Sequence, residues 1–217
     1  MDFDFDRAYL SDTVRIICGT DEAGRGPLAG PVVAAAVVLP SDSRIESLND
    51  SKKLSAKRRD ALYDEITSRA LSWGVGISSV EEIDRLNILE ASLLAMRRAV
   101  ENAHVTPDLL LVDGNIDRDF PYPALAVVGG DAKSPSIAAA SIIAKVTRDR
   151  MMESLDAEYP GYGLLRHKGY PTKAHKLAVY RLGASPCHRQ SFLSFLERDR
   201  EKLAAWDAEE REKSAES

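Results

Sequence analysis

Residues 32–39 form the longest apolar run of the chain, and this run restricts the possible folds more than any other segment. It reads Val-Val-Ala-Ala-Ala-Val-Val-Leu, without the alternation of polar and apolar residues that marks a half-exposed strand. A strand of this composition is buried on both faces, so helices must cover both sides of its sheet. The run is far too short to span a bilayer, and we expect no membrane association.

Other short apolar segments predict the remaining strands. They lie at residues 14–20, 73–78, 109–112 and 125–128. Residues 24–31, rich in Gly and Pro, join the first segment to the run at 32–39, as a hairpin-like connection requires. We therefore expect a sheet of several short strands.

Three helices have recognisable starts. They begin at Ser79, with Glu82 at capping-box spacing, at Ser134, followed by Pro135, and at Thr172. We expect these helices to end near residues 103, 155 and 183, and a last helical stretch to follow Pro186. The last of these segments is amphipathic at first and then almost entirely charged.

The order of these elements predicts the fold class. Strands come first, strands then alternate with helices, and the C-terminus is helical, which indicates an α/β fold with a mixed sheet flanked by helices. The Pro- and Gly-rich stretch at 159–163 would break any helix. We expect a core at 1–158, a small helical C-terminal subdomain at 159–200, and a frayed or disordered acidic tail at 201–217.

The net charge of −5 is concentrated at the two ends of the chain. Residues 1–20 contribute −2 and residues 197–217 contribute −3, so the body between them is neutral. Within it, residues 133–181 hold nine Lys or Arg against four Asp or Glu. This local excess suits a nucleic-acid backbone but equally suits a solvated helix face, so charge alone leaves both interpretations open.

The ends of the chain and its cysteines indicate its compartment. The first residues are acidic, whereas a signal peptide begins with basic residues. Cys18 and Cys187 lack the spacing of metal ligands and are expected to be reduced, buried thiols. We expect a cytoplasmic monomer.

Four carboxylates stand at the ends of three predicted strands. Asp21 and Glu22 follow the first strand, Asp113 ends the run at 109–112, and Asp131 follows the run at 125–128. Sites in α/β folds are built at the carboxyl ends of strands, although each acid alone also fits an ordinary turn. Neighbouring strand residues point to opposite faces, so Asp21 and Glu22 can share one site only if the chain leaves regular strand geometry there.

A cluster of four carboxylates is unfavourable without cations, because like charges repel. Oxygen ligands select Mg²⁺ or Mn²⁺, and two such ions about 4 Å apart can support phosphoryl transfer. No zinc pattern, phosphate-binding loop or serine nucleophile motif competes. The residues by themselves leave a metal-dependent phosphodiesterase and a set of acidic turns as alternatives.

The motifs of the chain resemble those of the type 2 ribonucleases H, the bacterial ribonucleases HII in particular. The matching segments are residues 21–31 (Asp-Glu-Ala-Gly-Arg-Gly-Pro-Leu-Ala-Gly-Pro), 50–54, 87–91, 111–114, 130–134, 138–149, 159–163 and 167–172. They occur in order over roughly residues 15–195. The resemblance implies a ribonuclease H-like core, cleavage 5′ of a ribonucleotide in RNA–DNA duplexes, and 3′-hydroxyl and 5′-phosphate products.

The resemblance also implies roles for single residues. The metal-binding catalytic carboxylates would be Asp21, Glu22, Asp113 and Asp131. The ribose 2′-hydroxyl would be read by Gly24, Arg25 and Gly26, and the RNA–DNA junction by Tyr170, which is otherwise an aromatic residue packed under a loop. Candidates for phosphate contact are Lys52, Lys53, Ser141 and Lys145, with ordinary surface or helix positions as the alternative.

Two other functions and one partner remain alternatives. A nuclease of the same fold acting on DNA or junctions would lack the Gly-Arg-Gly and Tyr170 signatures, and a pure hybrid-binding protein would gain nothing from four carboxylates. Residues 190–195 loosely resemble a peptide that binds a sliding clamp. We instead expect the apolar residues there, Phe192, Leu193, Phe195 and Leu196, to pack onto the body of the protein.

Overall fold

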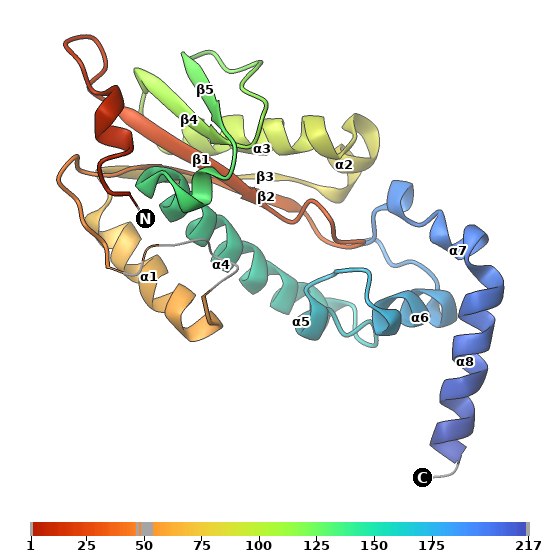
Figure 1. Ribbon diagram of the computed structural model, residues 1–217. Helices are drawn as coiled ribbons and strands as arrows, with labels where there is room; N and C mark the ends of the chain where they lie inside the picture. Colours follow the sequence, from red (N-terminus) through yellow and green to blue (C-terminus); the bar gives the residue numbers. More distant parts are fainter. Residues whose placement is uncertain (1, 47, 49–53, 216–217) are drawn as a thin grey trace.

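The computed structural model describes residues 2–46, 48 and 54–215, and its centre is a five-stranded sheet in the order β3-β2-β1-β4-β5 (Figure 1). The strands are β1 (Ile17–Ala23), β2 (Val32–Val38), β3 (Ser72–Ser78), β4 (Leu109–Asp113) and β5 (Ala124–Val127). β2 runs antiparallel to β1 and β3, whereas β4 runs parallel to β1 and β5. The predicted α/β class with a mixed sheet is confirmed.

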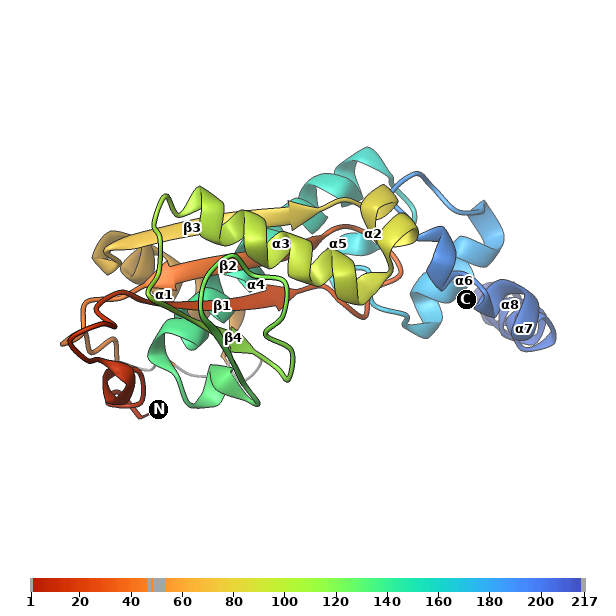
Figure 2. The ribbon, with the colours of Figure 1, turned by 90° about the horizontal axis from the view of Figure 1, so that it is seen from above.

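Helices cover both faces of this sheet, as the apolar run at 32–39 predicted. Ala34 and Ala36 of β2 face a cluster that contains α3 (Ile88–Asn102). The alternate residues Ala35 and Val37 face a second cluster, formed by α1 (Ala56–Arg69) and α4 (Pro135–Glu158). Figures 1 and 2 show the sheet between these two layers.

Small residues let the helices lie close to the sheet. A side chain at Gly76 of β3 would come within 2.0 Å of the Ala95 carbonyl oxygen in α3, and one at Gly19 of β1 within 2.3 Å of the Ile137 backbone in α4. The buried alanines 138, 139, 140 and 144 give α4 a narrow face toward the sheet. Close contact of this kind anchors α4, which carries part of the site.

The prediction of one continuous helix from residue 79 to about residue 103 is wrong. The segment is divided at Asn87 into α2 (Val80–Leu86) and α3. Asn87 has a φ of 74°, which ends α2, and its side chain then accepts hydrogen bonds from the amides of Leu89 and Glu90 to cap α3. The capping box at Ser79 is confirmed, and α1 is a helix that the sequence patterns did not predict.

A helical C-terminal part follows α4. It contains α5 (Leu164–His167), α6 (Lys173–Leu182), α7 (Phe195–Arg198) and α8 (Arg200–Ala215). These helices share an apolar cluster with Leu28, Ala29 and Met152 of the preceding region. Leu193 and Phe195 are buried in this cluster and Phe192 and Leu196 pack against it, so the expected packing of residues 190–195 is confirmed.

The last helical stretch, predicted after Pro186, is confirmed and continues as α8 to Ala215. The fraying or disorder expected from residue 201 stays a prediction. Leu203 is fully buried, and Arg181 of α6 forms ion pairs with Asp207 and Glu210 of α8. The division into a core at 1–158 and a C-terminal subdomain at 159–200 stays a proposal.

Within the described residues, no helix combines the length and apolar character that a membrane span requires.

Candidate active site

Strand pairing brings three of the four carboxylates together. The parallel register pairs Thr20 of β1 with Val112 of β4, so the next residues, Asp21 and Asp113, are neighbours at the same end of the sheet. Asp21 and Glu22 lie inside β1, because its pairing with β2 continues to Ala23. We required the chain to leave regular strand geometry if both acids were to share a site, yet both line one pocket while β1 is still paired with β2.

Asp113 also positions the segment that carries the fourth carboxylate. Its Oδ1 accepts hydrogen bonds from the backbone N–H groups of Gly130, at 2.7 Å, and of Asp131, at 3.4 Å. Asp131 belongs to the short 3-10 helix η3 (Gly130–Ala132) and is 8% exposed. A β-carbon at Gly130 would lie 3.1 Å from that Oδ1 and 2.5 Å from Ile137, which explains the glycine.

The carboxylates disturb one another's protonation. Burial, and then the charges of Glu22 and Asp113, raise the pKa of Asp21 well above its usual range, while a hydrogen bond from Ser141 opposes this shift. Burial also raises the pKa of Glu22, opposed by the nearby guanidinium of Arg25 at 3.3 Å. The site therefore disfavours full ionisation without a cation.

The donor set suits hard divalent cations, because every candidate ligand atom is a carboxylate oxygen. Among the described residues, no three Asp, Glu, His or Cys side chains converge into a finished metal-binding group. Glu22 is instead turned to Arg25, and one oxygen of Asp113 holds the η3 backbone. The carboxylates thus fit a metal by chemistry and proximity, not by a completed coordination shell.

A pocket of about 180 Å³ joins the acidic residues to the other predicted site residues. Its lining residues are Asp21, Glu22, Ala23, Gly24, Arg25, Ser141, Lys145, Arg148 and Tyr170. Tyr170 is 45% exposed and its ring carbon Cε1 is 3.7 Å from the position of a β-carbon at Gly26, so it is not packed under a loop. Residues from β1, α4 and the loop after α5 therefore share one surface.

Two of the four candidates for phosphate contact lie in this pocket, and the other two cannot be placed. The Ser141 hydroxyl donates to Asp21, and the Lys145 ammonium lies 2.6 Å from Asp149. Burial lowers the pKa of Lys145, although Asp149 opposes this. Lys52 and Lys53 lie outside the described residues.

Two buried arginines that the motifs did not single out hold the glycine loop. Arg148 of α4 is 1% exposed and donates to the carbonyls of Pro31 and Ala29 and, through Nη1, to that of Lys168. Arg189 is fully buried and donates to the carbonyls of Gly24, Arg25 and Gly30, among others. Loss of solvation lowers the pKa of Arg148 to about 10 and of Arg189 to about 9.

The position of the Arg148 side chain leaves room only for glycine at position 24. The φ of Gly24 is +100°, and a β-carbon there would come within 2.1 Å of the Arg148 side chain. Arg148 follows Ala144 by one helical turn, so a cation on the small apolar face of the predicted helix was a signal available in the sequence. We find no comparable signal for Arg189.

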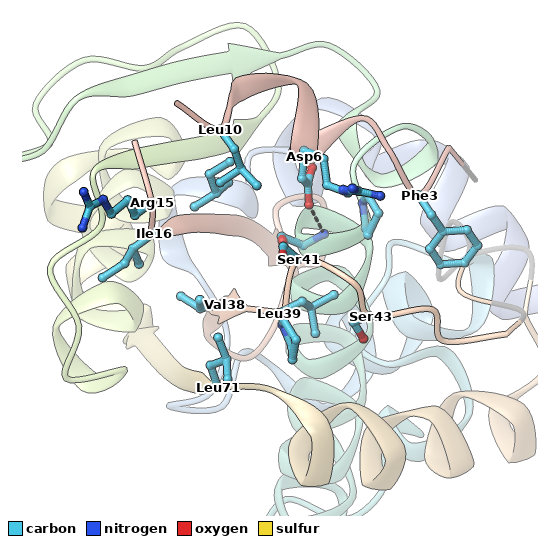
Figure 3. A pocket seen from close by; sticks show the side chains of 15 residues that line it. Phe3, Asp6, Leu10, Arg15, Ile16, Val38, Leu39, Ser41, Ser43 and Leu71 are labelled. Atoms are coloured by element: carbon cyan, nitrogen blue, oxygen red, sulfur yellow. Dashed lines mark hydrogen bonds between the residues drawn. The ribbon is translucent and has the colours of Figure 1, made fainter. Parts of the chain in front are cut away.

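A second pocket, of about 170 Å³, lies elsewhere, between the N-terminal segment and the opposite end of the sheet (Figure 3). Phe3, Asp6 and Leu10 line it together with Ile16, Leu39 and other residues, and Asp6 accepts a hydrogen bond from the Ser136 amide. It contains none of the predicted site residues, so the acidic pocket is the candidate active site.

Comparisons with known proteins agree with this location. The family model for ribonuclease HII matches residues 18–195. Ribonuclease H2 from Pyrococcus horikoshii OT3 is 28% identical with a TM-score of 0.69, covering 88% of this chain and 99% of that one.

Two further solved structures share the architecture. Ribonuclease HII from Archaeoglobus fulgidus, solved in complex with PCNA, is 29% identical with a TM-score of 0.68, covering 81% of this chain and 94% of that one. Bst ribonuclease HIII, solved with Mn²⁺, is 21% identical with a TM-score of 0.65, covering 91% of this chain and 68% of that one, and supports the fold alone. Since the family model spans most of the chain, the protein belongs to the ribonuclease HII family and is a ribonuclease H, a hydrolase of RNA in RNA–DNA hybrids.

Proposed function

We propose that this ribonuclease H is an endonuclease that cuts 5′ of a ribonucleotide, including a single ribonucleotide embedded in duplex DNA. The products would be a 3′-hydroxyl and a 5′-phosphate. One observation carries the proposal: the pocket that holds Asp21 and Glu22 is also lined by Gly24, Arg25 and Tyr170. Groups suited to reading a sugar thus lie beside groups suited to cutting the phosphate next to it.

Backbone groups of the glycine loop would recognise the ribose. The 2′-hydroxyl distinguishes RNA from DNA, and glycine lets backbone atoms approach it closely. The buried guanidinium groups of Arg148 and Arg189 already hold carbonyls of this loop. The loop would therefore meet the substrate in a preorganised shape, and the exposed ring of Tyr170 would pack on the sugar of the DNA side.

Asp21, Glu22, Asp113 and Asp131 would hold two Mg²⁺ or Mn²⁺ ions. Bound in this way, the ions would supply an activated water and stabilise the charge that develops on the phosphate. Ser141 would keep Asp21 oriented, and Lys145 would contact a substrate phosphate. Lys52 and Lys53 remain candidates for the same role, and the roles of all these residues are part of the proposal.

We propose no contact with a sliding clamp through residues 190–195. Leu193 and Phe195 are 7% and 3% exposed and belong to the C-terminal apolar cluster. Binding a clamp with these side chains would require that cluster to open.

The proposal is tested with duplexes that are identical except for their ribonucleotides. One duplex contains a single ribonucleotide, one contains several in succession, and one is entirely DNA. With Mg²⁺ or Mn²⁺ we expect one incision 5′ of the single ribonucleotide, mapped on a sequencing gel, and none on the DNA duplex.

Two outcomes would contradict the proposal. Cleavage of the all-DNA duplex would indicate a nuclease of the same fold with a different substrate. Cleavage only where several ribonucleotides follow one another would indicate a ribonuclease H without junction recognition.

A further inference from the structure

Two buried histidines near Tyr170 have no role in the chemistry proposed above. His175 of α6 is 0% exposed, and His188, in the segment after Pro186, is 1% exposed. Their Nε2 atoms are 3.0 Å apart. At this distance one imidazole donates a hydrogen bond and the other accepts it.

The partners at the two ends fix the direction of that bond. The Ser185 backbone N–H, which can only donate, lies 3.1 Å from Nδ1 of His188, and the Ser185 hydroxyl, which can also donate, lies 2.8 Å from the same atom. Nδ1 therefore accepts, and His188 carries its proton on Nε2. The Tyr170 carbonyl, which can only accept, lies 3.0 Å from Nδ1 of His175, so His175 carries its proton there. A chain of hydrogen bonds therefore runs from Ser185 through two neutral imidazoles to Tyr170.

Other groups hold the rest of the segment that leads to Tyr170. His167 stacks on His175, with ring centroids 4.3 Å apart, and its Nδ1 accepts from the Gly169 amide at 3.3 Å. Arg148 donates to the Lys168 carbonyl at 3.0 Å. The backbone is fixed on several sides while the Tyr170 side chain is 45% exposed, so the backbone determines where the ring points.

We propose that His175 and His188 are positioning residues that hold the carbonyl of Tyr170 and thereby align its ring with the substrate. This inference rests on the proposed function in one respect, namely that Tyr170 packs on the substrate sugar. Both histidines act through Tyr170, and neither lines the acidic pocket.

This chain of hydrogen bonds requires both imidazoles to be neutral. A proton added to Nε2 of His175 would place two N–H groups face to face and break the link to His188. Groups facing the pair are the ring of His167, the Ser185 hydroxyl at 2.8 Å and the Cys187 thiol at 3.8 Å from Nδ1 of His188, and the Tyr162 ring at 4.7 Å. Asp156 and Arg166 act on His167. Burial lowers the pKa of His175 to about 4 and also lowers that of His188, so the chain is intact at neutral pH.

Two substitutions of His175 separate positioning from packing. In His175→Asn, the side-chain amide nitrogen lies near the position of Nδ1 and can still donate to the Tyr170 carbonyl. In His175→Gln, the amide reaches the position of Nε2 and can meet His188, but the Tyr170 carbonyl loses its donor. Packing predicts that glutamine, closer to histidine in volume, is the milder change, whereas positioning predicts that asparagine is.

The measurement is incision of the single-ribonucleotide duplex, with binding of the same duplex in Ca²⁺ as the comparison. We expect His175→Gln to lower kcat about tenfold or more, because misplaced contacts weaken alignment, and to leave Kd within about threefold. We expect His175→Asn to keep kcat within about threefold of the parent. A glutamine variant as active as the asparagine variant, or more active, overturns the proposal.

Imidazole nitrogen spectra of the full-length protein at neutral pH give a second test that does not depend on the substrate. The expected result is a proton on Nδ1 of His175 and on Nε2 of His188, and any other arrangement overturns the proposal. If these tautomers are found but the parent cuts only runs of ribonucleotides, the proposed function fails instead. The asparagine and glutamine variants are then compared on the run, where equal activity overturns the positioning role.

Discussion

At the scale of single residues, Asp113 combines a charge with a structural hydrogen bond. Its charge raises the pKa of both Asp21 and Glu22, and its Oδ1 holds the backbone that leads to Asp131. Asparagine in the same position would keep the oxygen and lose the charge. The two contributions can therefore be measured separately.

We expect Asp113→Asn to lower cleavage on the order of 100-fold or more, because a charged ligand is lost where negative charge must be neutralised. Folding should survive, and the metal-free protein should melt at the same or a slightly higher temperature, since repulsion with Asp21 falls. Mg²⁺ should raise the melting temperature of the parent more than that of the variant. Cleavage rates and calorimetry with and without Mg²⁺ measure these effects.

Asp119→Asn is the matched control, because Asp119 is an exposed acid in the loop after β4. Its φ of 67° suits asparagine. It should cut and melt as the parent does. Near-parental cleavage by Asp113→Asn at saturating Mg²⁺ would contradict the assignment of Asp113 as a ligand.

The exposed ring of Tyr170 is the part that we propose to pack on the substrate sugar. We expect Tyr170→Ala to reduce incision at a single ribonucleotide about tenfold or more, because the sugar loses its positioning contact. Binding in Ca²⁺ should stay nearly unchanged, since phosphate contacts carry most of the affinity. Tyr180→Ala, at a tyrosine of α6 that is 36% exposed and outside the pocket, should have little effect on either measurement. Parental incision by Tyr170→Ala would leave Tyr170 without a role in recognition.

At the scale of elements, the acidic helix α8 covers basic side chains of α6. Arg181 pairs with Asp207 and Glu210, and Lys173 pairs with Glu209 at 3.2 Å. These cations belong to the basic region at 133–181, and we predict that this region faces the duplex. The helix would then compete with phosphates for part of that region.

We expect the triple variant Asp207→Asn, Glu209→Gln, Glu210→Gln to bind an uncleavable hybrid a few-fold more tightly at low salt, because Lys173 and Arg181 become free to meet phosphates. The gain should disappear at high salt, where exposed charges are screened. The loss of stability should be small, because ion pairs at the surface contribute little. Affinity titrations over a range of salt concentrations measure this effect.

This variant keeps Leu203 and its apolar contact. A simple deletion of residues 202–217 would remove that contact together with the charges. The charge-matched control is Glu197→Gln, Glu201→Gln, Glu212→Gln. If both triple variants gain affinity equally, the effect is one of net charge and not of the α6 pairs. Weaker binding by the first variant would show that the duplex-binding surface is misplaced.

At the scale of the whole molecule, buried histidines link pH to the stability of the C-terminal part. The pKa of His175 falls from 6.5 to about 4 on folding, because the buried ring cannot readily hold a charge. The unfolded chain therefore binds more protons between these values, and stability is full above pH 6.5 and falls as the pH drops toward 4.

We expect this residue to account for a loss on the order of 3 kcal/mol between about pH 6.5 and pH 4. The hydrogen-bonded ion pair with Arg98 lowers the pKa of Glu82 from 4.5 to about 2. The stability that this carboxylate contributes is therefore lost only as the pH falls from about 4.5 toward 2. Burial raises the pKa of Asp21, so this residue makes the folded protein more stable as the pH falls. Urea midpoints measured over this range should therefore change less steeply in His175→Asn. An equal slope in the variant and the parent would contradict a buried neutral histidine at this position.

The amino-acid sequence was sufficient to predict the fold class and the proximity of the acids. The unbroken apolar run at 32–39 required two covering layers, and acids at the ends of apolar runs converged because parallel strands end at one edge of a sheet. Cap residues such as Ser79 and Thr172 marked helix starts correctly, since a cap is a local interaction. The position of Tyr170 beside the glycine loop followed only from family resemblance.

Features that depend on partners distant in the chain could be found only in the folded protein. The packing of α8 on α6 involves Arg181 and the burial of Leu203, neither of which is visible in the composition of residues 201–217. The roles of Arg148 and Arg189 depend on carbonyl groups, which every residue has and no side chain reveals. Local sequence patterns reflect interactions between residues that are close together in the chain. Buried charges and hydrogen-bonded imidazoles depend instead on groups that only folding brings near them.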